Sequence, residues 1–258
     1  MTYALITGAS KGIGKAMAFE LASRKHNILL VARSEDLLKS VAHKLITDYG
    51  VQVAYLVADL SSPIAPQEVY NWCITKNYTI DILINNAGYG LSGKFDNYTL
   101  EENLNMMQVN MTTSIQLCQL FLPMLKQQTK SYILNVASSA AYQAVPGLSL
   151  YAATKVFMLN FSRGLRQELK NTSISVSSIC PGATDTDFSA RANVGPHALK
   201  AAEKVNMMPD IVAKIAIEGM FKGKAEIVPG IINKLNVVAA WLLPKVLLER
   251  VAMRLYRE

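Results

Sequence analysis

Hydrophobic and polar positions along the chain predict strands and helices in regular alternation. Short apolar runs bounded by polar or glycine-containing segments are typical of strands that are buried on both faces. We expect such strands at residues 3–7, 27–33, 51–57, 81–85, 131–136, 173–179 and 225–228. Longer segments repeat apolar residues every three or four positions, which is typical of helices. We expect helices after the first strand and at residues 35–49, 61–76, 100–109, 112–127, 150–169 and 210–221.

This alternation predicts the fold class. Strands that alternate with helices form a parallel sheet that is covered on both faces. We therefore predict an α/β fold, a Rossmann-type doubly wound parallel sheet of about seven strands. We expect a single domain over residues 1–258, with a core at 2–228 and a helical tail at about 231–256. Residues 184–206 have a weak pattern with Gly195 and Pro196 in it, and we expect them to form a mobile lid.

The composition is that of a folded protein with a mildly basic balance. Of the 258 residues, 51% are hydrophobic and 17% are charged, which excludes a disordered chain. The formal net charge is +7, but no basic run is longer than the pair Arg24-Lys25. We therefore expect no nucleic-acid partner and favour a small anionic ligand.

Cysteine and histidine usage gives no sign of disulfides or of a metal site. The scattered cysteines in apolar segments suit buried free thiols in a reducing compartment, so we expect a cytoplasmic protein. They are Cys73, Cys118 and Cys180. The histidines show no metal-ligand spacing, so we expect no metal. They are His26, His43 and His197. The first strand begins at Tyr3, which leaves no room for a signal peptide, and no apolar run approaches the ~18 residues of a membrane span.

A glycine-rich turn follows the first predicted strand and opens a helix. Gly8, Gly12 and Gly14 follow Thr7 with the spacing G-x-x-x-G-x-G. Glycine allows a tight bend and lets a pyrophosphate approach the helix N-terminus, where free N–H groups favour anions. Strand, turn and helix together predict a dinucleotide-binding site.

Charged residues near this turn favour a cofactor with an additional phosphate. In an NAD site an acidic residue commonly ends the second strand, whereas an arginine there suits a 2′-phosphate. Arg33 ends this strand, and Lys11 lies in the glycine turn. Each could be an ordinary surface cation, but together they favour NADP(H). Asp59 follows the third strand, where it either accepts a hydrogen bond from the adenine amine or caps the next helix.

The candidate reacting groups are a serine, a tyrosine and a lysine. Tyr151 and Lys155 are four residues apart in a predicted helix, so they lie on one face, one turn from each other. A phenol has a pKa near ~10, and a neighbouring cation lowers it, so that the tyrosine can exchange a proton with a carbonyl or alcohol oxygen. Ser138 follows the fifth strand and offers a hydroxyl to the same oxygen. The Y-x-x-x-K spacing alone also occurs by chance on amphipathic helices.

Five motifs in a fixed order resemble the short-chain dehydrogenase/reductase family in its compact one-domain form. They are T-G-A-S-K-G-I-G at 7–14, N-N-A-G at 85–88, Asn110, Ser138 with Tyr151-x-x-x-Lys155, and Pro181-Gly182. The resemblance extends from residue 2 to about 228. It implies hydride transfer between NADP(H) and a carbonyl or secondary alcohol, for which the protein supplies position and a proton.

The resemblance also implies roles for the matching residues. Tyr151 would be the general acid for carbonyl reduction and the base for alcohol oxidation, and Ser138 would orient the substrate oxygen. Lys155 would hold the nicotinamide ribose and lower the pKa of the tyrosine. Asn110 would hold a water between Lys155 and solvent, although a structural core amide is the alternative. The cofactor would contact Tyr151 and Lys155, and also Gly8, Ser10, Lys11, Gly12, Ile13, Gly14, Arg33, Asp59, Leu60, Asn86, Ala87, Gly88, Pro181, Gly182 and Thr184.

The tail departs from related reductases that end in a short strand and a glycine pair between subunits. We expect a homodimer or a homotetramer, without a choice between them. One stripe of the tail is apolar and its neighbour is basic: Leu247, Val251 and Leu255 beside Arg250, Arg254 and Arg257. Such a helix could pack on its own domain, on a sister subunit or on an anionic membrane. We favour a protein contact over a membrane, because the basic stripe has only three residues.

We predict an NADP(H)-dependent oxidoreductase that interconverts a carbonyl and a secondary alcohol. The residues expected around the substrate are mostly apolar, which suggests an apolar substrate. They are Tyr89, Leu91, Tyr142, Val145 and Phe188. The alternative is a non-catalytic NADP(H)-sensing protein on the same fold, since a fold does not determine a function. The intact set of candidate reacting groups favours the enzyme, because a sensor would not need them.

Overall fold

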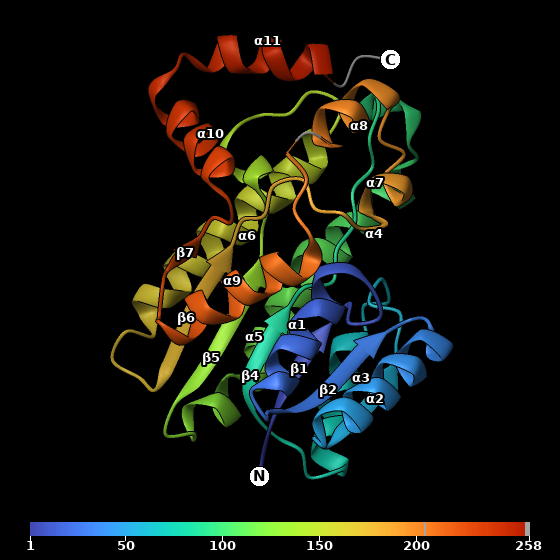
Figure 1. Ribbon diagram of the computed structural model, residues 1–258, viewed down its shortest axis with the longest axis vertical. Helices are drawn as coiled ribbons and strands as arrows, with labels where there is room; N and C mark the ends of the chain where they lie inside the picture. The colour runs from blue at the N-terminus through green and yellow to red at the C-terminus, as the bar shows by residue number, and fades with distance from the viewer. Residues whose placement is uncertain (204, 256–258) are drawn as a thin grey trace.

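The strands form one parallel sheet, whose order is β3-β2-β1-β4-β5-β6-β7 (Figure 1). The computed structural model describes residues 1–203 and 205–255. The strands are β1 (Thr2–Thr7), β2 (Asn27–Ala32), β3 (Val53–Val57), β4 (Thr79–Asn85), β5 (Ser131–Val136), β6 (Ile174–Ile179) and β7 (Glu226–Ile227). The chain first adds strands on one side of β1 and then on the other, so its direction reverses between β1 and β4. The predicted doubly wound α/β sheet is confirmed.

Helices cover both faces of the sheet. They are α1 (Gly12–Ser23), α2 (Glu35–Tyr49), α3 (Ala65–Thr75), α4 (Leu100–Met107), α5 (Thr113–Lys126), α6 (Ser149–Glu168), α7 (Phe188–Arg191), α8 (Pro196–Glu203), α9 (Pro209–Phe221), α10 (Ile231–Leu242) and α11 (Lys245–Leu255). Helices α1, α2 and α9 pack on one face, and α3, α5 and α6 pack on the other. Within β1, Ala4 and Ile6 face the first layer and Leu5 faces the second. Because both faces are buried, the strands have continuous apolar sequences.

The three cysteines are free thiols inside this packing, as the sequence predicts. Cys73 and Cys118 belong to the layer of α3 and α5, and Cys180 lies directly after β6. Burial raises the pKa of Cys73 to about 12 and that of Cys180 to about 11. A thiol whose pKa is raised in this way carries little thiolate, so these cysteines are unreactive core residues.

Asn110 lies in a π-helical turn, where the sequence pattern predicts only a break between two helices. The turn spans Gln108–Thr112 and joins α4 directly to α5. The N–H of Thr113 donates to the carbonyl of Gln108, five residues back in the chain. Such a turn inserts one extra residue into a helix and often occurs at functional sites. Hydrophobic periodicity does not reveal it, because the helical pattern continues on both sides.

The segment that the sequence predicts as a lid contains two short helices, α7 and α8. Pro196 is the first residue of α8, a position that proline favours in helices. A bridge between Thr184 and Met207 closes the base of the segment. A backbone hydrogen bond of 2.8 Å from the N–H of Ser92 to the carbonyl of Ala192 ties α7 to the segment after β4. Lys204 lies outside the described residues.

The tail is two helices instead of one. Helix α10 ends before Pro244, and Leu243 has the extended φ of −90° and ψ of 151° that a following proline favours. Helix α11 then crosses toward α8 (Figure 1). The predicted stripe residue Arg257 lies outside the described residues, as does the side chain of Leu255. Within the described residues no helix combines the length and the apolar character needed to cross a bilayer.

Candidate active site

A cavity of about 880 Å³ lies at the carboxyl ends of the strands. The segment that follows each of the first six strands contributes to its wall. These segments include Gly8, Arg33, Asp59, Asn86, Ser138 and Pro181, in the order β1 to β6. Residues of the lid, among them Phe188 and Arg191, close the other side. In open α/β sheets ligands bind at this edge, where the strand order reverses.

The structure brings most of the predicted site residues to this one cavity. All of them line it except Gly14 and Asn110. Gly8 and Gly12 have φ values of +64° and +54°, a left-handed conformation that glycine adopts without strain. At Gly14 a side chain would collide with Asn86 and with the carbonyl of Gly8, so Gly14 allows α1 to pack closely behind the turn. The amide of Asn86 donates to the carbonyls of Thr7 and Gly8, at 2.8 and 3.2 Å, and holds the turn in place.

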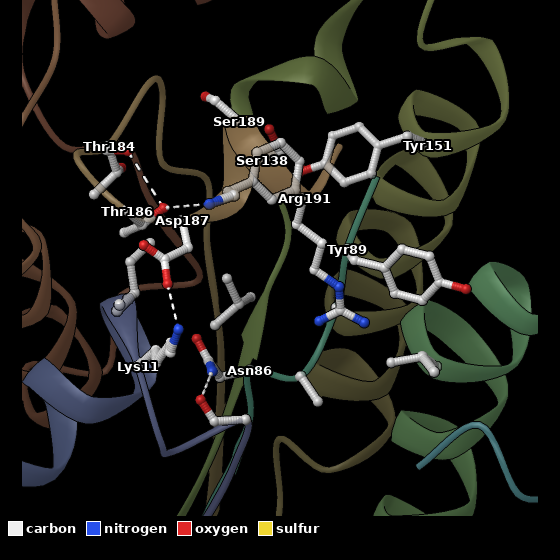
Figure 2. Close-up of a pocket in the computed structure, with 18 of the residues that line it drawn as sticks. Lys11, Asn86, Tyr89, Ser138, Tyr151, Thr184, Thr186, Asp187, Ser189 and Arg191 are labelled. Atoms are coloured by element: carbon white, nitrogen blue, oxygen red, sulfur yellow. Dashed lines mark hydrogen bonds and ion pairs between the residues drawn. The ribbon is translucent and has the colours of Figure 1, made fainter. Parts of the chain in front are cut away.

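Two ends of the cavity differ in their chemistry. We call the region around Asn110, Ser138, Tyr151 and Lys155 the buried end. We call the region around Lys11, Arg33, Asp59, Asp187 and Arg191 the charged end. Figure 2 shows Lys11 and Asp187 on one side of the cavity, with Tyr151 on the other.

Lys155 is the buried cation of the buried end. Only 4% of the residue is exposed, and its Nζ donates to the carbonyl of Val136 at 2.9 Å. Burial lowers the pKa of Lys155 to about 8, since desolvation disfavours the charged form. The Nζ lies 5.6 Å from the centre of the Tyr151 ring. Lys155 therefore lies close to the ring of Tyr151 in a medium of low polarity.

Tyr151 and Ser138 face the same space from different elements. Tyr151 stands on α6 with 8% of its surface exposed, and the ring of Phe188 from the lid lies 5.2 Å from its own. In Figure 2 the phenol oxygen of Tyr151 points toward Ser138. The Oγ of Ser138 accepts a hydrogen bond of 3.1 Å from the N–H of Ala140, which starts a short 3₁₀ turn after β5. This bond holds the oxygen of a serine that lines the cavity.

Asn110 lies behind the cavity wall with its amide fully engaged. Its Oδ1 accepts from the N–H of Tyr89 at 3.0 Å, and its Nδ2 donates to the carbonyl of Tyr89 and the hydroxyl of Thr154. A side chain at Gly88 would lie 3.1 Å from Asn110 Oδ1 and 3.3 Å from Lys155 Nζ. These bonds fasten the pair of helices α4 and α5 to the segment after β4. They support the interpretation of the Asn110 side chain as a structural core amide.

Three cations and two carboxylates gather at the charged end. Arg33 lies 3.9 Å from Asp59, and more than half of each side chain is exposed. Burial tends to raise the pKa of Asp59, but two hydrogen bonds from Ser61 and the charges of Arg33 and Arg191 outweigh it and lower that pKa. Burial and then the charge of Arg33 lower the pKa of Arg191. The guanidinium of Arg191 lies 4.4 Å from the centre of the Tyr89 ring, within range of a cation–π contact.

Lys11 forms an ion pair with the lid. Its Nζ lies 2.6 Å from Asp187, with side-chain exposures of 59% and 69% (Figure 2). The sequence predicts Lys11 beside the cofactor, and the structure places it on the cavity wall with Asp187 as its partner. An exposed pair of this kind contributes little stability, about 0–1 kcal/mol.

Three residues that line or support the cavity wall are absent from the site predicted from the sequence. Asp187 and Arg191 lie in the weakly patterned lid, and the only sequence signal for them is their charge. Asn233 begins the tail, and its buried amide donates to the carbonyl of Pro229 at 2.8 Å. A side chain at Gly182 would collide with Asn233. The tail therefore supports the Pro181-Gly182 segment of the cavity wall from behind.

The predicted substrate pocket is only partly on the cavity wall. Tyr89 and Phe188 line the cavity, whereas Leu91 and Val145 belong to the apolar cluster packed around Tyr151. Tyr142 points elsewhere, because its hydroxyl donates to Glu226 at 2.5 Å.

Comparison with known proteins identifies the family. The sequence profile of the family described as short chain dehydrogenase matches residues 2–196. An uncharacterized oxidoreductase of Staphylococcus epidermidis is 32% identical over 202 residues, covering 78% of this chain and 86% of that protein. A very-long-chain 3-oxoacyl-CoA reductase of Anas platyrhynchos is 34% identical over 193 residues, covering 72% of this chain and 61% of that protein. A solved short-chain dehydrogenase from Sphingobium yanoikuyae in complex with NADPH has a TM-score of 0.82 at 32% identity, covering 99% of this chain and 95% of that chain.

Fold and site define a Rossmann-type α/β protein with a cavity at the switch point of its sheet. The chain belongs to the short-chain dehydrogenase/reductase family and is an oxidoreductase of that family. The resemblance seen in the five sequence motifs is confirmed.

Proposed function

We propose that the protein is an NADP(H)-dependent oxidoreductase that interconverts a carbonyl and a secondary alcohol on an apolar substrate. The observation that carries this proposal is the meeting of Ser138, Tyr151 and Lys155 at one end of the cavity that the glycine turn opens. A proton donor with a buried cation beside it is what carbonyl reduction needs, because the alkoxide oxygen must be protonated as it forms.

The residues present fit a nicotinamide cofactor. Gly8 and Gly12 allow the tight bend of the turn, and the first N–H groups of α1 have no earlier turn to bond to. When bound, the cofactor supplies or accepts the hydride. The glycine turn would hold its pyrophosphate, and Lys155 would hold the ribose next to the reacting ring. The complex of the Sphingobium yanoikuyae enzyme with NADPH supports this assignment.

Tyr151 is the proposed general acid and base. Lys155 lies 5.6 Å from its ring and, when protonated, favours the phenolate, so the tyrosine gives up its proton more readily. Ser138 orients the substrate oxygen toward the phenol. The Asn110 side chain is occupied by Tyr89 and Thr154, so the contribution of Asn110 to proton relay would run through the backbone of the π turn in which it lies.

The charged end favours NADP(H) over NAD(H). Arg33 follows β2, where a carboxylate would repel a 2′-phosphate, and Arg191 adds a second guanidinium from the lid. Arginine suits this task, since its planar group can bind phosphate oxygens at two points. Each hydrogen bond with a charged partner contributes roughly 1.5–3 kcal/mol before solvent screening, which corresponds to a preference of about tenfold to a hundredfold.

The substrate is proposed to be apolar. Phe188 and Leu148 lie beside Tyr151 on the cavity wall, and Ala198 and Ala202 of α8 extend this apolar lining. The name of the Anas platyrhynchos relative describes a carbonyl compound with a long acyl chain, which supports the same class.

Self-association is proposed to use the layer of α5 and α6. Ile115 on α5 and Val156 and Phe157 on α6 are each about one third exposed. Exposed apolar side chains that gather in one patch mark a protein contact. A homodimer or homotetramer would bury them, and light scattering measures the mass that decides between the two.

The test is a screen of ketones and aldehydes of increasing apolar size, with NADPH absorbance as the readout. The proposal expects saturable NADPH oxidation with at least one class and a much lower rate with NADH. The alternative, an NADP(H) sensor, expects tight NADPH binding without turnover on any carbonyl or, in the reverse direction, any secondary alcohol. That result would overturn the enzyme assignment.

A further inference from the structure

The two-helix arm of α10 and α11 exposes an unusual amount of apolar surface. Of the twenty-four large apolar side chains that are exposed in the described chain, eleven lie in this arm. Six of the most exposed are Ile231, Leu235, Val238, Trp241, Leu242 and Val246, with 53–77% of their surface accessible. In Figure 1 the arm stands at the end of the molecule opposite the N-terminus, above the sheet and its helices. An apolar patch of this density marks an interaction surface.

The arm is held by its inner side, so packing on its own domain does not account for the exposed side. Asn233 is 5% exposed and lies behind Gly182. Ala252 is 4% exposed and belongs to the apolar cluster of Leu148 and Tyr151, while α11 packs against α8. Both helices are therefore fixed to the body by their inner side, while their outer residues stay exposed.

The charges of the arm indicate what covers it. Its exposed basic residues are Lys234, Lys245, Arg250 and Arg254. Glu249 is the one acidic residue between 231 and 255, so the arm carries a net charge of +3. The basic stripe predicted from the sequence lies on α11 alone. In the structure, exposed basic residues occur on both helices, together with the apolar side chains. Apolar and basic residues with few acidic ones among them are typical of a surface that lies on anionic lipid.

A second copy of the chain fits this surface less well. A symmetric dimer places the same patch of each subunit against the other. Two arms that each carry a net charge of +3 would then meet and repel each other. Trp241, 74% exposed at the end of α10, is instead a residue type that favours the boundary between lipid and water.

We propose that the arm of α10 and α11 docks the protein on the surface of an anionic phospholipid bilayer. The apolar side chains of α10 enter the headgroup boundary, and the lysines and arginines contact the lipid phosphates. Since α11 packs on α8, whose Ala198 and Ala202 line the cavity, docking brings the lid side of the cavity next to the lipid. The docking step itself does not depend on the proposed enzymatic function.

Cosedimentation of the full chain with vesicles tests the proposal. We expect binding to vesicles of phosphatidylglycerol and phosphatidylcholine, at least tenfold weaker binding to phosphatidylcholine alone, and a decrease with salt. The variant Trp241→Asp/Leu242→Asp should lose binding at least tenfold, and Arg250→Gln/Arg254→Gln should weaken it to a similar degree. The matched controls Ile64→Asp and Lys44→Gln change exposed residues of the same kinds outside the arm and should bind as the unmodified chain does.

Two further measurements keep the test decisive. Circular dichroism and the melting temperature of each variant show whether it is folded, and light scattering gives its mass. The proposal is overturned if the folded, unmodified chain stays in the supernatant with both vesicle types. It is also overturned if Trp241→Asp/Leu242→Asp lowers the mass of the oligomer while vesicle binding is absent or unchanged, since the arm would then contact a second copy.

Discussion

Lys155 and Arg33 are cations of the same cavity, but they lie in very different surroundings at its two ends. Lys155 is 4% exposed and hydrogen-bonded to a strand carbonyl, and burial lowers its pKa to about 8. The side chain of Arg33 is 55% exposed, and its nearest carboxylate is 3.9 Å away. Charge interactions are strong at the first site and screened by water at the second. Single changes should therefore act on the reaction at the buried end and on cofactor preference at the charged end.

The largest effect is expected from Tyr151→Phe at the buried end. Loss of the phenol oxygen removes the proposed proton donor, so kcat should fall by about 10²-fold or more. NADPH affinity and melting temperature should stay close to those of the unmodified protein, because the ring and its contact with Phe188 remain. Tyr89→Phe, which removes a phenol oxygen elsewhere on the cavity wall, is the matched control and should retain most of kcat. A Tyr151→Phe enzyme that keeps more than about a tenth of kcat would show that another group moves the proton.

The charged end should respond in cofactor preference. We expect Arg33→Asp to lower kcat/KM for NADPH by about tenfold to a hundredfold and to leave NADH unaffected or improved. The effect should shrink as ionic strength rises, since the site is exposed. Lys44→Asp changes the charge of α2 by the same amount outside the cavity wall and serves as the control. Equal use of NADH and NADPH by the unmodified enzyme would contradict the assignment of this end to a phosphate.

The lowered pKa of Lys155 predicts a pH dependence of NADPH binding, with an effect of intermediate size. Below pH 8 the lysine is charged and attracts the anionic cofactor, and above pH 8 the free protein loses this charge. The 2′-phosphate of NADPH is doubly charged above its second pKa near ~6. The Kd for NADPH should therefore be constant from about pH 7 to pH 8 and rise by at most tenfold per pH unit above pH 8. The measurement uses Tyr151→Phe, so that titration of the tyrosine does not contribute. A Kd that is flat up to pH 10 would mean that Lys155 remains charged, or that it does not bind the cofactor.

The smallest effect is expected at the ion pair of Lys11 and Asp187. Asp187→Asn frees Lys11 for the cofactor, and an exposed pair contributes about 0–1 kcal/mol, so KM for NADPH should fall by at most about fivefold. The control Asp185→Asn removes a negative charge from the same segment but leaves the ion pair intact. It distinguishes the effect of breaking the pair from the effect of losing a negative charge. An increase in KM with Asp187→Asn would show that the pair holds the lid in a binding-competent position.

Much of the fold and part of the site follow from local sequence. Continuous apolar runs and helical periodicity are properties of neighbouring residues, so they predict the seven-stranded doubly wound sheet and the boundaries of most elements. The glycine turn and the position of Ser138 after β5 are equally local, because backbone freedom and strand ends depend on few residues. The four-residue spacing of Tyr151 and Lys155 depends only on helix geometry.

Only the tertiary structure decides the contacts between distant parts of the chain. Lys11 and Asp187 are 176 residues apart, and their pairing depends on how the lid folds over the glycine turn. Asn233 behind Gly182, Arg191 on the cavity wall and the break of the tail into an exposed two-helix arm have the same origin. The burial that lowers the pKa of Lys155 likewise belongs to the packed protein. Local patterns determine which elements form, whereas packing determines which side chains meet and how much water reaches them.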